Sequence, residues 1–126
     1  MVRENEIARE VVDVAYNIHR GLGAGLFESV YEAVMAYEFK KRGLQFERQK
    51  PLPIIYEDVH LNEGFRIDFM VEDKVIIELK SIEKIAPVHK KQLLTYLRLA
   101  NKRLGLLINF NVDLIKNGIT RMVNNL

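Results

Sequence analysis

The chain has 126 residues, of which 48% are hydrophobic and 29% charged, and it contains no cysteine. This composition predicts a single globular domain over residues 1–126 and excludes a disulfide framework or a thiolate metal site. No apolar run approaches the roughly 18 residues that a membrane span needs. The first ten residues are charged where a secretory signal is apolar, so we expect a cytoplasmic protein without a membrane partner.

Charge is unevenly distributed along the chain. Residues 1–83 carry 11 basic and 16 acidic side chains, whereas residues 84–126 carry 8 basic side chains and a single acid, Asp113. The net charges of these two parts are therefore −5 and +7. Clustered lysine and arginine attract polyanions and release condensed counterions when they bind nucleic acid. The last third of the chain thus indicates either a nucleic-acid contact or a solvated basic surface.

Two helices are expected at the start of the chain. Apolar residues recur at helical spacing between residues 5 and 20, with glutamates near the beginning, where the helix dipole favours anions. Glycines at positions 21, 23 and 25 then interrupt the pattern. A second periodic stretch begins near Phe27, and Gly43 suits the position just past its end.

Strands dominate the rest of the chain, with one more helix among them. Pro87 suits the first turn of a helix that runs to about Ala100. The stretches expected to be strands are LQFERQ (44–49), PLPIIY, FRIDFMV (65–71), KVIIELKS (74–81), LGLLINF (104–110) and, more weakly, GITRMV (118–123). This order predicts an α/β protein, specifically an α+β mixed sheet with helices packed on it.

Two acids and a lysine occupy the hairpin of residues 65–81. Asp68 is expected on the face of its strand opposite to an apolar row, and Glu78 and Lys80 share one face of the following strand. The apolar row comprises Phe65, Ile67, Phe69 and Val71. Opposed residues of an antiparallel pair point to the same side of the sheet. A two-residue turn at 72–73 would therefore place Glu78 on the face opposite to Asp68. A three-residue loop at 72–74 opposes Asp68 with Glu78, so we expect an odd loop or a bulge here.

Adjacent carboxylates in an apolar sheet repel each other, so a positive charge is expected beside them. Oxygen ligands without cysteine or an adjacent histidine suit a hard divalent ion, Mg²⁺ or Mn²⁺. Lys80, one pleat beyond Glu78, would lie beside this ion and orient its water or neutralise a phosphate. The alternative is a surface ladder of ion pairs among Asp68, Glu78 and Lys80.

The hairpin sequence RIDFMVEDKVIIELK resembles the signature of the PD-(D/E)xK nuclease superfamily, although Ile67 replaces the proline before the aspartate. The stretch QLLTY, with Gln92 and Tyr96, resembles the Q-x-x-x-Y helix of the exonuclease branch of that superfamily. Three residues of GLGAGLFESVYE spell the G-x-x-E-x-x-Y motif that names a prokaryotic family within it. They are Gly25, Glu28 and Tyr31.

This resemblance implies a restriction-endonuclease-like core of helix, three-stranded meander, helix and strand, with an extra N-terminal helix. It implies a metal centre in which Asp68, Glu78 and the carbonyl of Leu79 hold the ion. Glu28 completes the metal shell directly or through water. Alternatively, with Gly25 as the N-cap, Glu28 is the third helical residue and only stabilises the helix terminus. Lys80 would position the attacking water.

Further residues are candidates for contact with substrate. Gln92 would orient Lys80 or the scissile phosphate. His19 would reach the site or a phosphate, or else cap the first helix. The candidate contacts to the nucleic-acid backbone at the third helix are His89, Lys90 and Lys91, with a solvated basic face as the alternative. Tyr96, also a candidate nucleic-acid contact, is like Tyr31 expected to be a core aromatic with its hydroxyl tied to polar neighbours.

Two functions fit these residues. The first is a Mg²⁺- or Mn²⁺-dependent nuclease that hydrolyses phosphodiester bonds in DNA or RNA. The second is a nucleic-acid-binding or protein-interaction module that keeps the nuclease fold without turnover. A homodimer is expected for the nuclease, because so small an enzyme needs two copies to reach both strands of a duplex.

Overall fold

The computed structural model describes residues 3–126, apart from the side chains of residues 62 and 63. The helices are α1 (Arg3–Leu22), α2 (Glu28–Lys41) and α3 (Pro87–Ala100). The strands are β1 (Phe46–Tyr56), β2 (Val59–Val71), β3 (Val75–Lys80), β4 (Leu104–Asn109) and β5 (Ile119–Val123), the last preceded by a 3-10 turn, η1 (Ile115–Gly118). Within these residues, no helix is both long and apolar enough to cross a membrane.

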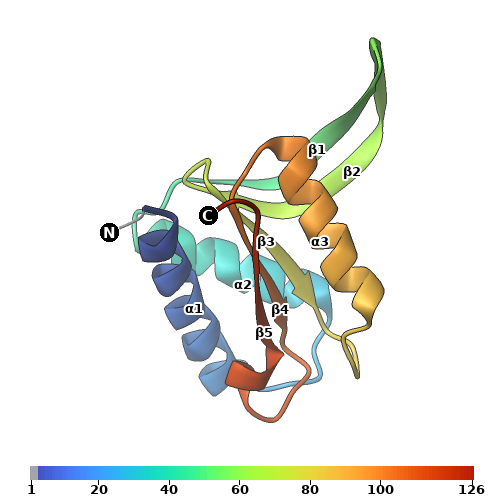
Figure 1. Cartoon of the computed structure of the whole chain (residues 1–126). Coiled ribbons are helices and arrows are strands. Elements are labelled where there is room, and N and C mark those ends of the chain that lie inside the picture. The colour runs from blue at the N-terminus through green and yellow to red at the C-terminus, as the bar shows by residue number, and fades with distance from the viewer. Residues whose placement is uncertain (1–2) are drawn as a thin grey trace.

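The strands form one five-stranded sheet in the order β1-β2-β3-β4-β5 (Figure 1). β1, β2 and β3 form an antiparallel meander, whereas β3 and β4 are parallel and are connected through α3. A parallel pair requires such a long crossover, usually a helix. β5 returns antiparallel to β4. The predicted mixed sheet, with its helix, meander, helix and strand and the additional N-terminal helix, is confirmed.

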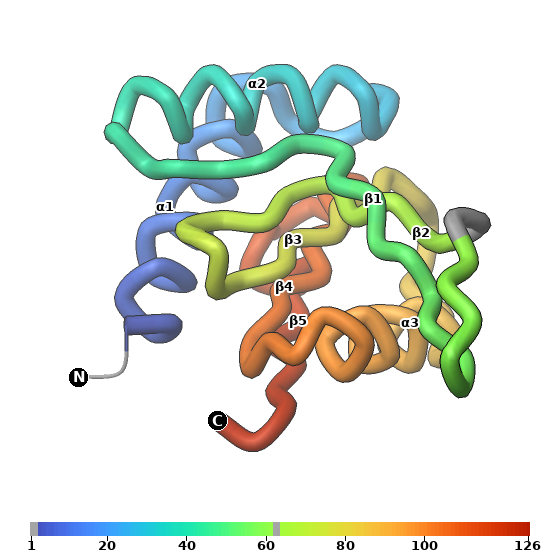
Figure 2. Tube along the Cα trace, turned by 90° about the horizontal axis from the view of Figure 1, so that it is seen from above, coloured from blue at the N-terminus to red at the C-terminus, as the bar shows by residue number. Residues whose placement is uncertain are grey.

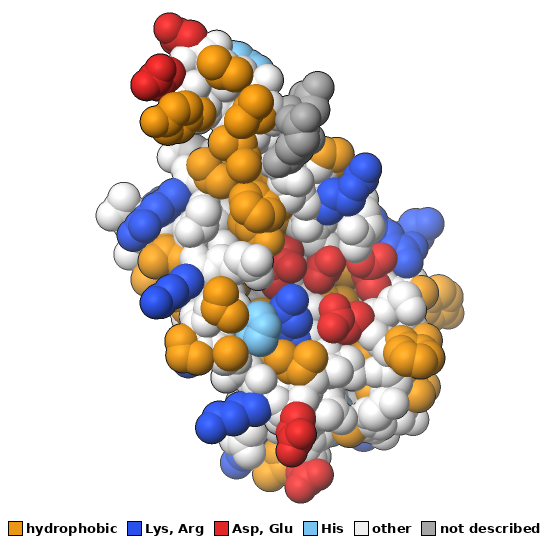
Figure 3. Space-filling view, turned by 90° about the vertical axis from the view of Figure 1, so that its right-hand side faces the viewer, with side chains coloured by type: hydrophobic (Ala, Val, Ile, Leu, Met, Phe, Trp, Pro, Cys, Tyr) orange, Lys and Arg blue, Asp and Glu red, His pale blue; other side chains and the backbone are white. Residues whose placement is uncertain are grey.

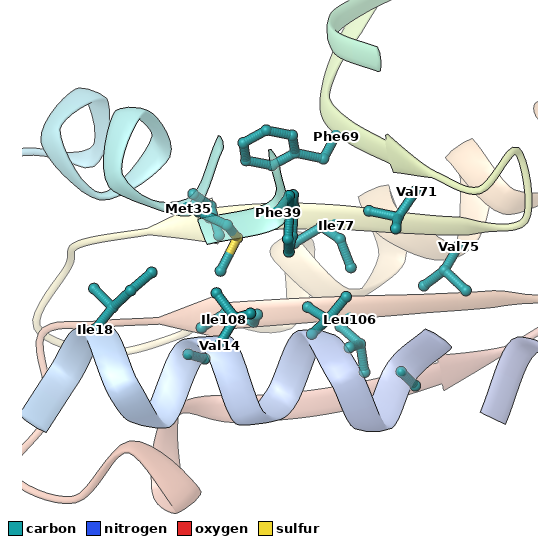
Figure 4. Packing of buried hydrophobic residues seen from close by; sticks show 14 of the residues in the cluster. Val14, Ile18, Met35, Phe39, Phe69, Val71, Val75, Ile77, Leu106 and Ile108 are labelled. Carbon is teal, nitrogen blue, oxygen red and sulfur yellow. The ribbon is translucent and has the colours of Figure 1, made fainter. Parts of the chain in front are cut away.

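Different helices cover the two faces of the sheet. α1 and α2 pack on one face and α3 on the other (Figure 2). On the first face, Val14 of α1 and Phe39 of α2 meet Ile77 and Leu106 of the central strands (Figure 4). Leu93 of α3 belongs to the smaller cluster on the second face. Because both faces are covered, β3 and β4 are buried along almost their whole length, as their apolar sequences predict.

The expected strands LQFERQ and PLPIIY form the single strand β1. Pro51 and Pro53 made the pattern look discontinuous, but β1 is an edge strand, where proline is tolerated because one side of the strand has no neighbour to bond. The two stretches meet near Gln49, whose φ of 52° kinks the strand.

The hairpin of β1 and β2 projects beyond α3 as a two-stranded arm, residues 53–64 (Figure 1). β2 begins at Val59, six residues before the expected strand. The register between the strands shifts between Leu52 and Ile54. At this point a Cβ on Gly64 would overlap the carbonyl oxygen of Leu52, so only glycine fits.

Candidate active site and metal centre

The register of the β2–β3 hairpin decides whether its two acids face the same side. Phe69 pairs with Ile77 and Val71 with Val75, which leaves residues 72–74 as a three-residue loop. The odd loop predicted from the sequence is therefore confirmed. Continued by one residue, the same register opposes Asp68 with Glu78.

Each of the two carboxylates bonds to the backbone of the other strand. The backbone N–H of Asp68 donates to Oε1 of Glu78 over 3.1 Å, and the N–H of Leu79 donates to Oδ2 of Asp68 over 2.8 Å. These bonds continue the connection between β2 and β3 beyond the last backbone pair, Phe69 with Ile77. Both acids are thus held in place by the backbone, which fixes their position better than surface ion pairs would.

A kink in the meander accompanies this change of bonding. Arg48 pairs with Phe69 and Lys50 with Ile67, while Gln49 and Asp68 between them are left out of the ladder. Phe69 packs with α1 and α2, whereas Ile67 packs with α3. The expectation that Phe65, Ile67, Phe69 and Val71 form one apolar row is therefore wrong. The strand changes its buried side at Asp68, which brings this carboxylate to the edge of both clusters.

A hollow of about 220 Å³ lies where α2 meets this kink. Its lining residues are Glu28, Ser29, Glu32, Gln49, Asp68 and Leu79. α2 begins at Glu28 with Phe27 as its N-cap, so the expectation that Gly25 is the N-cap and Glu28 the third helical residue is wrong. Glu28 is exposed at the first helical position, where the helix dipole favours an anion.

Tyr31 fixes the glycine-rich loop that precedes α2. Its hydroxyl donates to the carbonyl of Gly23 over 2.6 Å and accepts the N–H of Leu26 over 3.2 Å. Its ring is fully buried and stacks on Phe110 with centroids 4.3 Å apart. Ser81, directly after Lys80 in the chain, donates to the carbonyl of Leu26 over 2.5 Å. The expected core tyrosine with a bonded hydroxyl is confirmed, and it joins the loop before Glu28 to the core.

Burial shifts the proton affinity of both strand acids. Loss of solvation, followed by the charge of Asp68, raises the pKa of Glu78 from 4.5 to about 8. Burial likewise raises the pKa of Asp68, and the Glu32 carboxylate adds to this while the Leu79 N–H opposes it. Lys80 lowers the pKa of both acids. The pKa of Tyr96 is raised by burial and then by the charges of Glu78 and Asp68, which indicates that α3 also borders the site.

This shift makes the stability of the metal-free protein depend on pH. In the folded protein Glu78 keeps its proton up to about pH 8, whereas the unfolded chain releases it near pH 4.5. The free energy of unfolding should therefore fall as pH rises through this window, by an amount on the order of a few kcal/mol. Urea titrations at several pH values measure this slope. Glu78→Gln should flatten it, whereas Asp73→Asn in the same hairpin should not; equal slopes for wild type and Glu78→Gln would contradict the assignment.

The donor atoms at the site fit a hard divalent ion. Mg²⁺ accepts one or two carboxylates together with waters and substrate phosphates, and the two strand acids supply such a pair. Burial raises the pKa of both acids, and a bound cation would oppose this by favouring their ionised forms. Across the described residues, however, no three His, Cys, Asp or Glu side chains are grouped closely enough to hold one ion. The fitting set is therefore Asp68 and Glu78 with main-chain oxygen and water, and Glu28 lies at the edge of the hollow.

Two residues of the hollow were missed from the sequence. Glu32 forms an ion pair with Arg48, Oε2 to Nε 2.7 Å, and its other oxygen accepts from Gln49. Nε2 of Gln49 also donates to Oδ1 of Asp68 over 3.1 Å. The spacing of Glu32 four residues after Glu28 places both on one side of α2, which was a usable signal. No sequence signal pointed to Gln49, because its placement depends on the kink.

The comparison with protein families agrees with this geometry. The model of the PD-(D/E)XK nuclease superfamily matches residues 5–122. The chain belongs to this superfamily. No curated protein and no solved structure matched the chain.

The remaining candidates lie at different places in this PD-(D/E)XK domain. Lys80 ends β3 and is partly buried, and Gln92 is exposed on α3. Tyr96 is buried against Phe65, with ring centroids 4.9 Å apart. Nδ1 of His89 accepts the N–H of Ala86 over 2.9 Å and so caps α3.

Lys90 and Lys91 are exposed in the first turns of the PD-(D/E)XK domain's third helix, α3. His19 lies in a separate hollow of about 320 Å³, which Arg20 and Lys116 also line. Nε2 of His19 lies 2.8 Å from the carbonyl oxygen of Val112. This contact ties the end of α1 to the loop after β4, so His19 is not brought into the hollow that Asp68 lines.

Proposed function

We propose that the chain is a GxxExxY-type nuclease that hydrolyses phosphodiester bonds, in DNA before RNA, with Mg²⁺ or Mn²⁺. One observation carries this proposal: Asp68 and Glu78 lie side by side on neighbouring strands, partly or fully buried and held by backbone N–H groups. Buried like charges are costly unless a cation compensates them. The motif residues Gly25, Glu28 and Tyr31, which form the loop and helix start beside this pair, support the narrower family assignment.

Each residue has a proposed role in this reaction. Asp68, Glu78 and the carbonyl of Leu79 hold the ion, and Glu28 binds one of its waters. When bound, the ion lowers the pKa of a water and neutralises charge on the phosphoryl oxygens. Lys80 holds the attacking water and offsets the phosphate charge. Gln92 orients the scissile phosphate from α3.

The basic C-terminal third supplies the proposed nucleic-acid contact. Lys90 and Lys91 are exposed in the first turns of α3, next to the helix end that His89 caps. In neutral His89 the bond from Ala86 to Nδ1 leaves Nε2 as the donor for a phosphate oxygen. Tyr96, on the same helix as these cations, borders the acids. Binding through lysines should weaken steeply with salt.

Incubation of the protein with single-stranded and duplex DNA and with RNA tests this function. We expect products only with Mg²⁺ or Mn²⁺, and none with a chelator or with Ca²⁺ alone. A second candidate, a nucleic-acid-binding module without turnover, is favoured by the net charge of +7 over residues 84–126. It predicts salt-sensitive binding with no products under any metal, and that result would overturn the nuclease proposal.

A further inference from the structure

The arm carries an apolar row that the described residues of this chain leave uncovered. Leu52 and Phe65 oppose each other at its base and are packed against α3. The same face of the hairpin continues outward through two opposed apolar pairs. These are Ile54 with Leu61 and Tyr56 with Val59. Their exposure grows toward the end of the arm, reaching 53% for Val59 and 67% for Tyr56.

A strand face of this kind is normally buried. The alternation of apolar residues along both strands is the pattern of a sheet face packed on a core, yet α3 covers only its base. A two-stranded hairpin is also marginal by itself in water. In Figure 3 the hydrophobic side chains form a continuous strip along the projecting arm, with acidic side chains at its end. Such a patch indicates an interaction surface.

The partner is constrained by the charges at the two ends of this row. The turn at the tip of the arm carries Glu57 and Asp58, which disfavours a phosphate backbone there. α3, which packs against the base of the arm, carries exposed Lys90, Lys91 and Arg98 and no acid. Along the arm and α3 the surface is therefore acidic at the tip, apolar in the middle and basic on α3, and acidic side chains lie beside the base of the strip (Figure 3).

Because its two ends carry opposite charges, this surface is complementary to the same surface of a second copy rotated by 180°. Two copies related by a two-fold axis would lay their arms antiparallel, with apolar row on apolar row. The acidic tip of each arm would then reach α3 of the other copy. Strand addition at the outer edge of β1 is disfavoured, because Pro51 and Pro53 have no N–H to donate. Packing face against face uses the apolar row instead.

We propose that two copies of this chain form a homodimer through the arm, residues 53–64, each arm lying with its apolar row against that of the other copy. The dimer places both sets of active-site acids in one particle. This pairing does not depend on the nuclease activity, so it can be tested on a protein that never cleaves.

Molar mass across a dilution series, from sedimentation velocity or light scattering, tests the dimer. Wild type should dimerise, and the double variant Tyr56→Ser with Val59→Ser should raise the dissociation constant by about tenfold or more. Tyr37→Ser is the matched control, because Tyr37 is 63% exposed on α2, away from the arm. It should leave the dissociation constant unchanged. Unfolding curves should show that every variant is folded.

Charge exchange tests the antiparallel arrangement. Arg98→Glu should weaken the dimer, and the combination of Arg98→Glu with Glu57→Arg and Asp58→Arg should restore it. A wild-type protein that stays monomeric at all concentrations would overturn the proposal, as would a dimer unaffected by the arm variants. Arm variants that reduce nucleic-acid binding while the mass stays monomeric would also overturn it and make nucleic acid the occupant.

Discussion

Asp68→Asn should reduce the rate of Mg²⁺-dependent cleavage by roughly 10³-fold, with the fold retained. The amide keeps the size of the side chain and still accepts the Leu79 N–H through its oxygen, but it removes the charge that binds the cation. Lys80→Ala should have an effect of similar size because it removes the ammonium group beside the attacking water. Initial rates at saturating Mg²⁺ measure both losses.

A neighbouring acid provides the control for this loss of activity. Asp73 lies in the loop of the same hairpin, where its highly exposed side chain pairs with Lys102, N to O 3.2 Å. Asp73→Asn should therefore leave the cleavage rate unchanged. If Asp68→Asn and Asp73→Asn have equal activity, the cleaving centre is not at Asp68.

Tyr31→Ala should lower the free energy of unfolding by about 3–5 kcal/mol, the usual cost of removing a fully buried aromatic ring. The ring is stacked on Phe110 and fills the core beneath the start of α2. Tyr31→Phe keeps the ring and removes only the hydroxyl, leaving the Gly23 carbonyl and Leu26 N–H without that partner, for about 1–3 kcal/mol. Urea unfolding measures both changes.

The same pair of variants separates stability from positioning. Because the Tyr31 hydroxyl holds the loop before Glu28, Tyr31→Phe should also lower the cleavage rate of the still-folded protein. Tyr37→Phe, at an exposed tyrosine of the same helix, should change neither quantity. A fully active Tyr31→Phe would show that the loop does not position Glu28.

The central part of the site could be predicted because it depends on local periodicity. Alternation along β3 put Glu78 and Lys80 on one face, and the requirement that Asp68 share it predicted the three-residue loop that is observed. The buried strand β4 could likewise be predicted from its apolar content, and the start of α3 from the proline in its first turn. Such features depend on residues close in sequence.

Features that depend on uncommon backbone conformations could not be predicted from the sequence. A φ of 52° at Gln49 is uncommon for a residue other than glycine, so nothing indicated that β1 kinks there or that the Gln49 amide reaches Asp68. The reversal of the buried side between Ile67 and Phe69 follows from the same kink. The outer part of β2 was missed because Gly64 reads as a break, whereas it permits the close approach of Leu52.

The location of a bound cation tests whether Asp68 and Glu78 form the metal centre. Crystals grown with Mn²⁺ and measured at an energy where manganese scatters anomalously would show the ion itself. We expect one peak within bonding distance of both the Asp68 and Glu78 carboxylates, next to Leu79, and its loss in Asp68→Asn. A protein that binds Mn²⁺ only elsewhere, or not at all in the presence of nucleic acid, would contradict it.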